Sequence, residues 1–328
     1  MFISFNFAKP NETVISMQKE IQFIFNPSEL GAGTRGASLG PNAILTAARK
    51  NNSSLFQNRD IKLIQDFNQL LDNKQESSHA KFIGGILAVY DAVAEEIESC
   101  IKINKFPMII AGDHSSAGGT IKGLAKSFPN KSIGVLWIDA HADLHTPYTT
   151  PSGNIHGMPL ATAIGTDNHK CKKNDINDET KSQWNSLKSN ALLPENLVYI
   201  AVRDTEKEED FLINEHQIKN YTVEEVRSIG INQLLKQLEI KFSKIDVLYV
   251  SFDVDSMDPE LTSHGTGTPV PNGLTPIEAK QILTGVCKFS NLKALELVEV
   301  NPCLDENKNK MAETALELLE AITQTLEH

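Results

Sequence analysis

Short runs of apolar, often β-branched residues alternate along this chain with segments of helical periodicity. Seven runs are predicted to form strands, and they cover residues 20–26, 60–67, 106–112, 132–139, 196–202, 244–255 and 293–301. Most of these runs are continuously apolar instead of alternating, which is typical of strands buried on both faces. The pattern therefore predicts an α/β fold in which helices cover a parallel sheet.

Helix signals lie between several of these runs. Apolar residues recur at helical spacing between residues 82 and 100, and again from about 311 to 327, so both segments are predicted to be helices. Two helix starts carry a threonine followed three residues later by a glutamate: Thr222 with Glu225, and Thr275 with Glu278. These helices fit the alternation expected of an α/β fold.

Three polar stretches separate the predicted elements. Residues 48–60, 72–80 and 165–188 are interpreted as surface loops within one domain, and no internal repeat is present. The length of 328 residues leaves room for two domains, although α/β folds of this size often form one unit. We expect a single domain over residues 1–328.

The charge balance excludes some classes of partner. Lys and Arg number 31 and Asp and Glu number 42, for a net charge of −11, so neither nucleic acid nor a membrane surface is expected as a partner. The apolar runs are far shorter than the ~20 residues of a membrane helix, and the first twelve residues lack the features of a signal peptide. Four cysteines without a C-x-x-C pair favour a reduced, cytoplasmic setting.

Acidic and imidazole side chains gather where three of the predicted strands end. One strand is followed by Asp-His, the next by a D-x-H-x-D triplet, and the third by D-x-D. The potential metal ligands in these segments are His114, Asp139, His141, Asp143, Asp253 and Asp255. The carboxyl ends of neighbouring parallel strands meet at one crevice, so a single pocket is expected to collect them. Alternate residues of each triplet share a side if the strand geometry continues.

Two imidazoles and four carboxylates form a ligand set that suits Mn²⁺, with Co²⁺, Fe²⁺, Zn²⁺ and Ni²⁺ as competitors. Two divalent ions balance four carboxylates, whereas one ion leaves negative charge crowded into a partly dry site. Each residue alone is more simply explained as a helix cap, a turn aspartate or a hydrogen-bonded histidine. Four carboxylates at this density, however, need a cation. The sequence therefore predicts a dinuclear metal site.

Three segments carry a resemblance to a known family: AGDHSSAGG (111–119), DAHADLHTPYTTPSGNIHG (139–157) and SFDVDSMDP (251–259). They resemble the signature segments of the ureohydrolase superfamily. The T-x-x-S-G-N-x-H-G loop is similar to that of arginases, more than to those of agmatinases or formimidoylglutamases. The resemblance extends from about Gly31 to the last helix. It implies one three-layer α/β/α domain with an eight-stranded parallel sheet, usually assembled into trimers or hexamers.

The resemblance implies two Mn²⁺ ions per chain, with Co²⁺ as an alternative. The first ion would be held by His114, Asp139, Asp143 and Asp253, and the second by Asp139, His141, Asp253 and Asp255. Asp139 and Asp253 would then bridge both ions. The implied reaction is hydrolysis of L-arginine to L-ornithine and urea. Guanidine carbon is a poor electrophile, and a hydroxide bridging two metal ions is a nucleophile strong enough to attack it near neutral pH.

Further residues match functional positions of the family. His156 matches a proton-shuttling histidine, Glu299 the acid that pairs with the guanidinium group, and Asp143 is counted as catalytic as well as a ligand. The substrate-binding residues implied in addition are Thr268 near the guanidinium group, Ser152 and Asn154 on the α-carboxylate, and Asp204 and Glu206 on the α-amino side.

The chain departs from the arginase pattern mainly on the amino-acid recognition side. His145 stands where arginases usually carry Asn, and a histidine can also donate to a carboxylate. Glu206 replaces the usual Asp and reaches one methylene further. In addition, Ala111 replaces a common glycine, and the segment before Gly265 is one residue longer. None of these changes removes a metal ligand.

Three functional hypotheses remain at this stage. Arginine hydrolysis leads, and the second is hydrolysis of another guanidino compound, such as agmatine or a guanidino acid, on the same metals. The Ser152-Gly153-Asn154 loop argues against a substrate without an α-carboxylate, while His145 and Glu206 keep that possibility open. The third is a noncatalytic relative, which the presence of all six ligands and His156 argues against.

Overall fold

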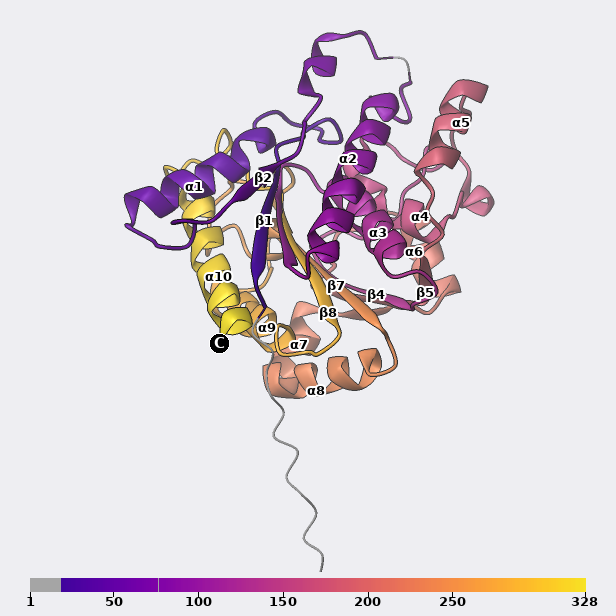
Figure 1. Ribbon diagram of the computed structural model, residues 1–328. Coiled ribbons are helices and arrows are strands. Elements are labelled where there is room, and N and C mark those ends of the chain that lie inside the picture. The colour runs from indigo at the N-terminus through magenta and orange to yellow at the C-terminus, as the bar shows by residue number, and fades with distance from the viewer. Residues whose placement is uncertain (1–18, 76) are drawn as a thin grey trace, which may run out of the picture.

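Eight parallel strands form one sheet in the computed structural model, which describes residues 19–75 and 77–328 (Figure 1). The strands are β1 (Ile21–Asn26), β2 (Ile61–Leu63), β3 (Phe106–Ala111), β4 (Ile133–Ile138), β5 (Leu192–Ile200), β6 (Lys219–Tyr221), β7 (Val247–Asp253) and β8 (Leu292–Val298). Their order across the sheet is β2-β1-β3-β8-β7-β4-β5-β6, and each neighbouring pair is parallel. The predicted parallel α/β sheet is confirmed.

Helices cover both faces of the sheet and complete a three-layer α/β/α arrangement. The helices are α1 (Gly40–Lys50), α2 (Ile83–Lys102), α3 (Ser116–Ser127), α4 (Pro159–Ile164), α5 (Asp178–Leu187), α6 (Lys207–Glu215), α7 (Val223–Ile229), α8 (Ile231–Phe242), α9 (Pro276–Val286) and α10 (Lys310–Glu327). Helices α1, α7, α8, α9 and α10 pack on one face, and α2 to α6 contribute to the apolar core on the other. Each face therefore has its own hydrophobic core.

Strand β4 shows why the apolar runs are continuous. Its residues Leu136 and Ile138 belong to the core on one face, while Val135 and Trp137 belong to the core on the other, and all four are fully buried. Successive side chains of a strand point to opposite faces, so a central strand needs apolar residues at every position.

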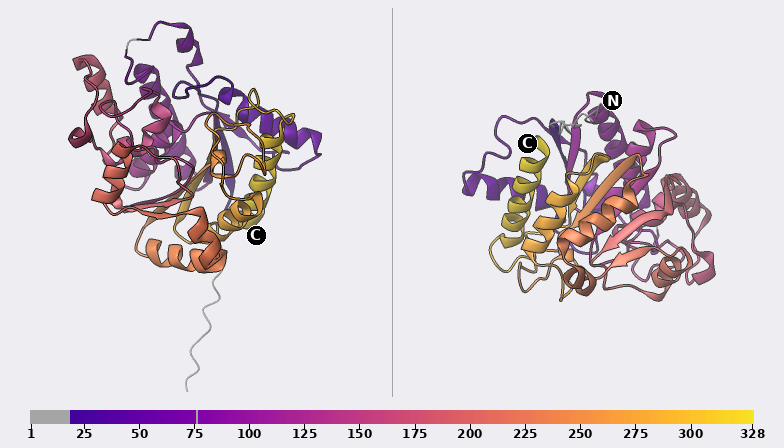
Figure 2. Two further views of the ribbon diagram at one scale, coloured as in Figure 1. Left: turned by 180° about the vertical axis from the view of Figure 1, so that it is seen from behind. Right: turned by 90° about the horizontal axis from the view of Figure 1, so that it is seen from below.

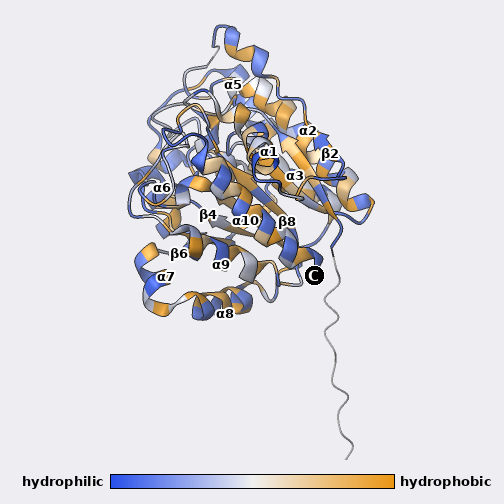
Figure 3. Ribbon diagram, turned by 90° about the vertical axis from the view of Figure 1, so that its left-hand side faces the viewer, coloured by the Kyte–Doolittle hydropathy of each residue, from blue (hydrophilic) through white to orange (hydrophobic). Residues whose placement is uncertain are grey.

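Helices α1 and α10 lie side by side although they are far apart in the sequence (Figure 2). Figure 3 shows polar and apolar residues mixed along α8 and α10, as expected of helices with one buried face. The Arg59 guanidinium donates to both carboxylate oxygens of Glu327 at 2.6 and 2.8 Å, which ties the end of α10 to the segment before β2. The backbone N–H of Lys19 donates to the Leu326 carbonyl at 3.0 Å, so the two ends of the described chain are also joined.

Both helix starts marked in the sequence are confirmed. Thr275 Oγ1 accepts from the backbone N–H of Glu278 at 3.0 Å, and the Glu278 carboxylate accepts from the Thr275 N–H at 2.8 Å. Thr222 caps α7 through the Glu225 N–H, but the Glu225 carboxylate binds Lys219 Nζ at 2.7 Å instead of returning to the cap.

The loop predictions need correction. Residues 165–188, interpreted as a polar loop, contain helix α5, whose start is capped by Asn177 and whose Trp184 side chain is fully buried. Helix α1 extends into the stretch 48–60, and strand β6 has no counterpart among the predicted strands. Local polarity concealed α5 and β6 because only one or two residues of each belong to a hydrophobic core.

Among the described residues, no helix is long and apolar enough to cross a membrane. The first twelve residues, interpreted as lacking a targeting signal, lie outside the described part of the chain, as do the first eighteen residues of the expected domain.

Candidate active site

Four neighbouring strands end at the same place on the carboxyl edge of the sheet. Across the sheet these strands are β3, β8, β7 and β4. His114 follows β3 and Glu299 follows β8, while Asp253 is the last residue of β7 and Asp139 follows β4. Strand connections run outward in both directions from this point, with β1 and β2 on one side and β5 and β6 on the other. Ligand sites of open α/β sheets form where the strand order reverses in this way.

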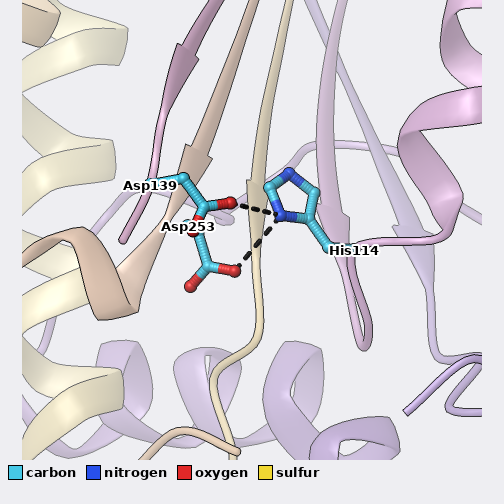
Figure 4. A group of neighbouring side chains, drawn as sticks. All are labelled: His114, Asp139 and Asp253. Carbon is cyan, nitrogen blue, oxygen red and sulfur yellow. Dashed lines mark ion pairs between the residues drawn. The ribbon is translucent and has the colours of Figure 1, made fainter. Parts of the chain in front are cut away.

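One group of ligand atoms converges on His114 Nδ1. Its distances are 3.0 Å to Asp139 Oδ2, 3.2 Å to Asp143 Oδ2 and 3.2 Å to Asp253 Oδ2. Figure 4 shows three of these side chains pointing toward one another from separate strands. All four residues are buried. The structure thus brings together every residue expected to hold the first ion.

Asp139 and Asp253 are oriented by the same local turn. Asp139 Oδ1 accepts from the His141 N–H at 2.7 Å, and Asp253 Oδ1 accepts from the Asp255 N–H at 2.8 Å. In each residue the backbone therefore binds one carboxylate oxygen, and the other oxygen faces His114. The convergence does not arise from continued strand geometry, because β4 ends at Ile138 and Asp143 has a positive φ of 51°.

Two further residues fix the ring of His114. Its Nε2 lies 2.7 Å from Ser251 Oγ, and its ring stacks on that of Trp137 at a centroid distance of 4.0 Å. Partners of this kind hold the tautomer and orientation of a ligating histidine. Sequence reasoning did not identify Ser251, although it lies two residues before Asp253 and so on the same side of β7.

The second group of ligand atoms contains Asp139, His141 and Asp255. His141 Nδ1 lies 3.1 Å from Asp255 Oδ2 and 3.5 Å from Asp139 Oδ1. Thr268 Oγ1 donates to Asp255 Oδ2 at 3.1 Å, so this predicted substrate contact also orients a ligand. Asp253 belongs to the first group, and its role as a bridge between two ions remains a prediction.

Arg203 holds the loop that carries Asp255 and Thr268. Its guanidinium donates to the backbone carbonyls of Asp255 at 2.9 Å and Val270 at 2.6 Å, among others. Sequence reasoning missed this residue because its partners are backbone atoms, which leave no side-chain pattern to recognise.

The residues of the two groups fit a bound metal. His114 Nδ1 and Asp139 Oδ2 are buried and lie 3.0 Å apart, yet within the described part of the chain neither atom makes a well-aligned hydrogen bond, although buried polar atoms are normally paired. Burial and the neighbouring Asp139 carboxylate raise the pKa of Asp143 to about 6, and burial with the adjacent Asp255 and Asp139 carboxylates raises the pKa of Asp253 well above its usual range. Crowded carboxylates with unpaired lone pairs are stabilised by divalent cations.

A small cavity of about 170 Å³ opens over the first group. Its lining includes the predicted residues His114, His141, Asp143, His145, Ser152, Asn154, His156, Glu206, Asp253, Thr268 and Glu299. Asp204 is not among the lining residues. Its exposed carboxylate lies 3.7 Å from His141 Nε2, at the outer side of the second group.

Glu299, which is buried, and His156, which is half-buried, form a pair inside the cavity. His156 Nδ1 lies 3.0 Å from Glu299 Oε1, which also accepts from the His114 N–H at 2.9 Å. Burial opposes the charged form of His156, but the hydrogen bond to Glu299 and the nearby carboxylates raise its pKa to about 9. Burial likewise disfavours ionised Glu299, yet the His156 contact holds the pKa of Glu299 below its usual range. Glu299 has a φ of 67°, a strained backbone typical of functional positions.

The two departures on the recognition side contact each other. His145 Nε2 lies 2.9 Å from Glu206 Oε2, and this hydrogen bond lowers the pKa of Glu206 to about 2. Glu209, which sequence reasoning missed, is buried 3.6 Å from His145 Nε2, and burial raises its pKa to about 8. The sequence pattern E-x-x-E at the start of α6 could have identified Glu209, because a capping box places Glu206 and Glu209 at the same helix end.

The loop after Tyr148 presents Ser152 and Asn154 to the cavity. Thr150 Oγ1 accepts from the N–H groups of Ser152 and Gly153, and Ser152 Oγ accepts from the N–H of Asn154 at 3.2 Å. These bonds within the loop fix its shape before any ligand binds.

This fold and this cavity define a class: an α/β protein with a histidine and carboxylate metal centre at the carboxyl edge of a parallel sheet. The Arginase family model matches residues 19–324. The chain is 34% identical over 308 residues to the arginase of Bacillus subtilis (strain 168), covering 93% of this chain and 98% of that one. The chain belongs to the arginase family.

Solved structures agree with this assignment. The arginase of Entamoeba histolytica in complex with L-ornithine matches with a TM-score of 0.81 at 29% identity, covering 93% of this chain and 99% of that one. The arginase of Bacillus subtilis matches with a TM-score of 0.77 at 32% identity, covering 93% and 98% respectively. The family resemblance inferred from the three sequence segments is therefore confirmed.

Proposed function

We propose that this chain hydrolyses L-arginine to L-ornithine and urea at a dinuclear metal site. The observation that carries the proposal is the convergence of the Asp139, Asp143 and Asp253 carboxylates on His114 Nδ1, within 3.2 Å, next to a cavity lined by Glu299 and His156. Membership of the arginase family and the similarity to an arginase solved with L-ornithine support it.

Two Mn²⁺ ions per chain, with Co²⁺ as the alternative, fit the N and O donors of the site. His114, Asp139, Asp143 and Asp253 would hold one ion, and Asp139, His141, Asp253 and Asp255 the other. Bound there, the ions would supply Lewis acidity and make water ionisable near neutral pH.

Glu299 is proposed to bind and orient the guanidinium group. Its Oε1 already accepts from the His114 N–H and lies near His156 Nδ1. Its Oε2 faces Gly267, and a side-chain carbon added at Gly267 would lie 3.6 Å from that oxygen. A carboxylate held in this way accepts two parallel hydrogen bonds from a planar guanidinium group. A guanidinium group bound in this way would lie near His114, whose N–H donates to the same carboxylate.

His156 is proposed to move a proton to the leaving amino group. Its Nδ1 is hydrogen-bonded to Glu299, so Nε2 is the ring atom available for the transfer. With a pKa raised to about 9, the imidazole holds a proton at neutral pH and can act as a general acid.

The other end of the cavity is proposed to bind the amino-acid portion of the substrate. Ser152, Asn154 and His145 would receive the α-carboxylate, while Glu206 and the outlying Asp204 would lie on the α-amino side. Because His145 and Glu206 contact each other in the cavity, hydrolysis of a different guanidino compound is the second candidate function.

We also propose that the chain acts as one catalytic domain within a cytoplasmic homo-oligomer, a trimer or a hexamer. The ligands come from strands of a single sheet, which supports the single domain. The proposed oligomer and location rest on the family resemblance and the absence of a C-x-x-C pair from the sequence.

A substrate panel tests the proposal. Urea release is measured for L-arginine, agmatine and guanidino acids with the Mn²⁺-loaded protein. A site that hydrogen-bonds the α-carboxylate rejects substrates without it by factors of order ~10⁴. We therefore expect strong preference for arginine. Equal turnover of agmatine would favour the second candidate, and absence of urea from every substrate would contradict both.

A further inference from the structure

Lys81 lies behind the loop that we propose to receive the α-carboxylate. Its ammonium Nζ donates to Asn154 Oδ1 at 3.0 Å, and its backbone N–H donates to the Gly153 carbonyl at 2.9 Å. The side chain is half-buried between the start of α2 and this loop. Main chain and side chain of Lys81 thus both hold the segment that carries Asn154.

The contact fixes the orientation of the Asn154 amide. An ammonium group only donates hydrogen bonds, so the amide oxygen must face Lys81 and the amide NH₂ must face away. On that opposite side Nδ2 is held against Gly33, where an added side-chain carbon would lie 2.6 Å from it. The Asn154 amide is therefore held in one orientation, in which its NH₂ group faces away from Lys81.

The charge of the cavity gives this contact a second consequence. The lining holds five carboxylates and no Lys or Arg: Asp143, Glu206, Glu209, Asp253 and Glu299. Among the described residues, the one side-chain hydrogen-bond partner of Lys81 Nζ is the neutral amide of Asn154. The positive charge of Lys81 therefore affects the loop that carries Ser152 and Asn154, called the recognition loop below. The hydrogen bond from the ammonium group polarises the Asn154 amide and strengthens its NH₂ group as a donor.

We propose that Lys81 is a positioning residue that makes the site specific for ligands carrying an α-carboxylate. It acts through Asn154, by orienting and polarising the amide and by placing the positive charge of its ammonium group behind the loop that carries Asn154. The inference rests on the proposed function, because it names the group by which an amino-acid substrate is recognised. It predicts that the lysine matters for carboxylate-bearing ligands alone.

The test compares ligand pairs that differ by the carboxylate. Binding of L-ornithine and of putrescine is measured by calorimetry for the Mn²⁺-loaded parent, K81M and K81R, and steady-state kinetics follow for L-arginine and agmatine. K81M should weaken ornithine binding and raise KM for arginine by about tenfold or more, the loss expected for one charge-assisted hydrogen bond. Putrescine binding, agmatine kinetics and kcat for arginine should stay within about twofold, and K81R should retain most of the parent affinity.

Lys74→Met is the matched control, because Lys74 lies in the same segment but lines a separate surface cavity. It should leave both ligands unaffected. Equal weakening of ornithine and putrescine by K81M would show a purely structural role and overturn the inference, as would unchanged ornithine binding. A parent protein that binds ornithine without hydrolysing arginine would contradict the proposed function, while the binding comparison would still decide the role of Lys81.

Discussion

The triplets Asp139-Ala140-His141 and Asp253-Val254-Asp255 build the metal centre in the same way. In each, one oxygen of the leading aspartate accepts the N–H two residues on, and the other faces His114. The geometry follows from an aspartate's preference to bond its local backbone where a strand ends. A two-residue spacing thus yields converging ligands even though the strand does not continue.

Substitutions should separate ligands from the proposed proton shuttle. Asp139→Asn removes a charged donor shared by both ligand groups, so we expect it to lose bound metal as well as turnover. His156→Asn should keep its metal and lose about 10²- to 10⁴-fold in kcat, the range for general acid catalysis. The measurement is elemental analysis beside the rate of urea release. If the His156→Asn protein contained no metal, the proton-shuttle role would be contradicted, and His156 would instead be needed for metal binding.

Asp167 provides a prediction about pH. Although partial burial opposes its charged form, its Oδ1 accepts from Trp184 Nε1 at 2.8 Å and from Lys188, which lowers the Asp167 pKa in the folded state. A carboxyl with a depressed folded pKa stabilises the protein above its unfolded pKa of about 3.9, and this contribution is lost as pH falls through the folded value.

Asp167→Asn should therefore lower the free energy of unfolding by about 1 kcal/mol at pH 7, after allowance for solvent screening. The difference from the parent should shrink below about pH 4. Denaturant titrations of both proteins at several pH values measure it. Asp175→Asn is the control, because that carboxylate is fully exposed and should leave the unfolding midpoint unchanged. A difference that grows toward low pH would contradict the assignment.

At the scale of elements, one glycine lets the recognition loop pack against the segment before α2. Gly153 has a φ of 78°, and a side-chain carbon there would lie 1.9 Å from the Ser78 carbonyl oxygen. Gly153→Ala must therefore shift the loop as well as strain its backbone. We expect a loss of about 1–3 kcal/mol in unfolding free energy together with a higher KM for arginine.

Thermal unfolding and arginine kinetics check this expectation. Gly157→Ala is the control for stability, because a side-chain carbon at Gly157 meets nothing within 4 Å. If Gly153→Ala proved as stable as the parent, the contact between this loop and Ser78 would be less rigid than the structure indicates.

The sequence was sufficient to predict elements and ligands where the signal is local. Continuous apolar runs indicated seven of the strands, and threonine-to-glutamate spacing indicated two helix starts. Helix α5 and strand β6 were missed because few of their residues reach a core. Lys81 was missed for another reason: it acts on Asn154, which is distant in sequence, and pairing of that kind arises from the fold, not from spacing. Ser251 and Glu209 also act on distant residues, although their spacing from Asp253 and Glu206 offered a local signal.

At the scale of the whole molecule, the site depends on the order of the strands. Strand β8, late in the sequence, pairs with β3, and β7 pairs with β4, so residues from 114 to 299 meet at one edge. The sequence indicated the converging strand ends but not this order, and the family resemblance implied an eight-stranded parallel sheet without the order of its strands. The order matters because β8, which is followed by Glu299, lies between β3, which precedes His114, and the strands β7 and β4 that lead into the two aspartate triplets.

Metal should consequently stabilise the entire fold as well as the reaction. Removing divalent cations leaves the buried carboxylates of Asp139, after β4, and Asp253, at the end of β7, repelling one another beside the His114 imidazole. A ligand that binds only the folded state at 100 times its Kd contributes about 2.7 kcal/mol, so chelation should lower Tm by about 5 °C or more. Urea release should cease, and Mn²⁺ or Co²⁺ should restore both properties.

In Asp139→Asn the chelator should change Tm little, because the site has already lost affinity for metal. The measurements are thermal scans, urea assays and elemental analysis of the same samples. Full activity in protein shown to contain no metal would refute the dinuclear centre.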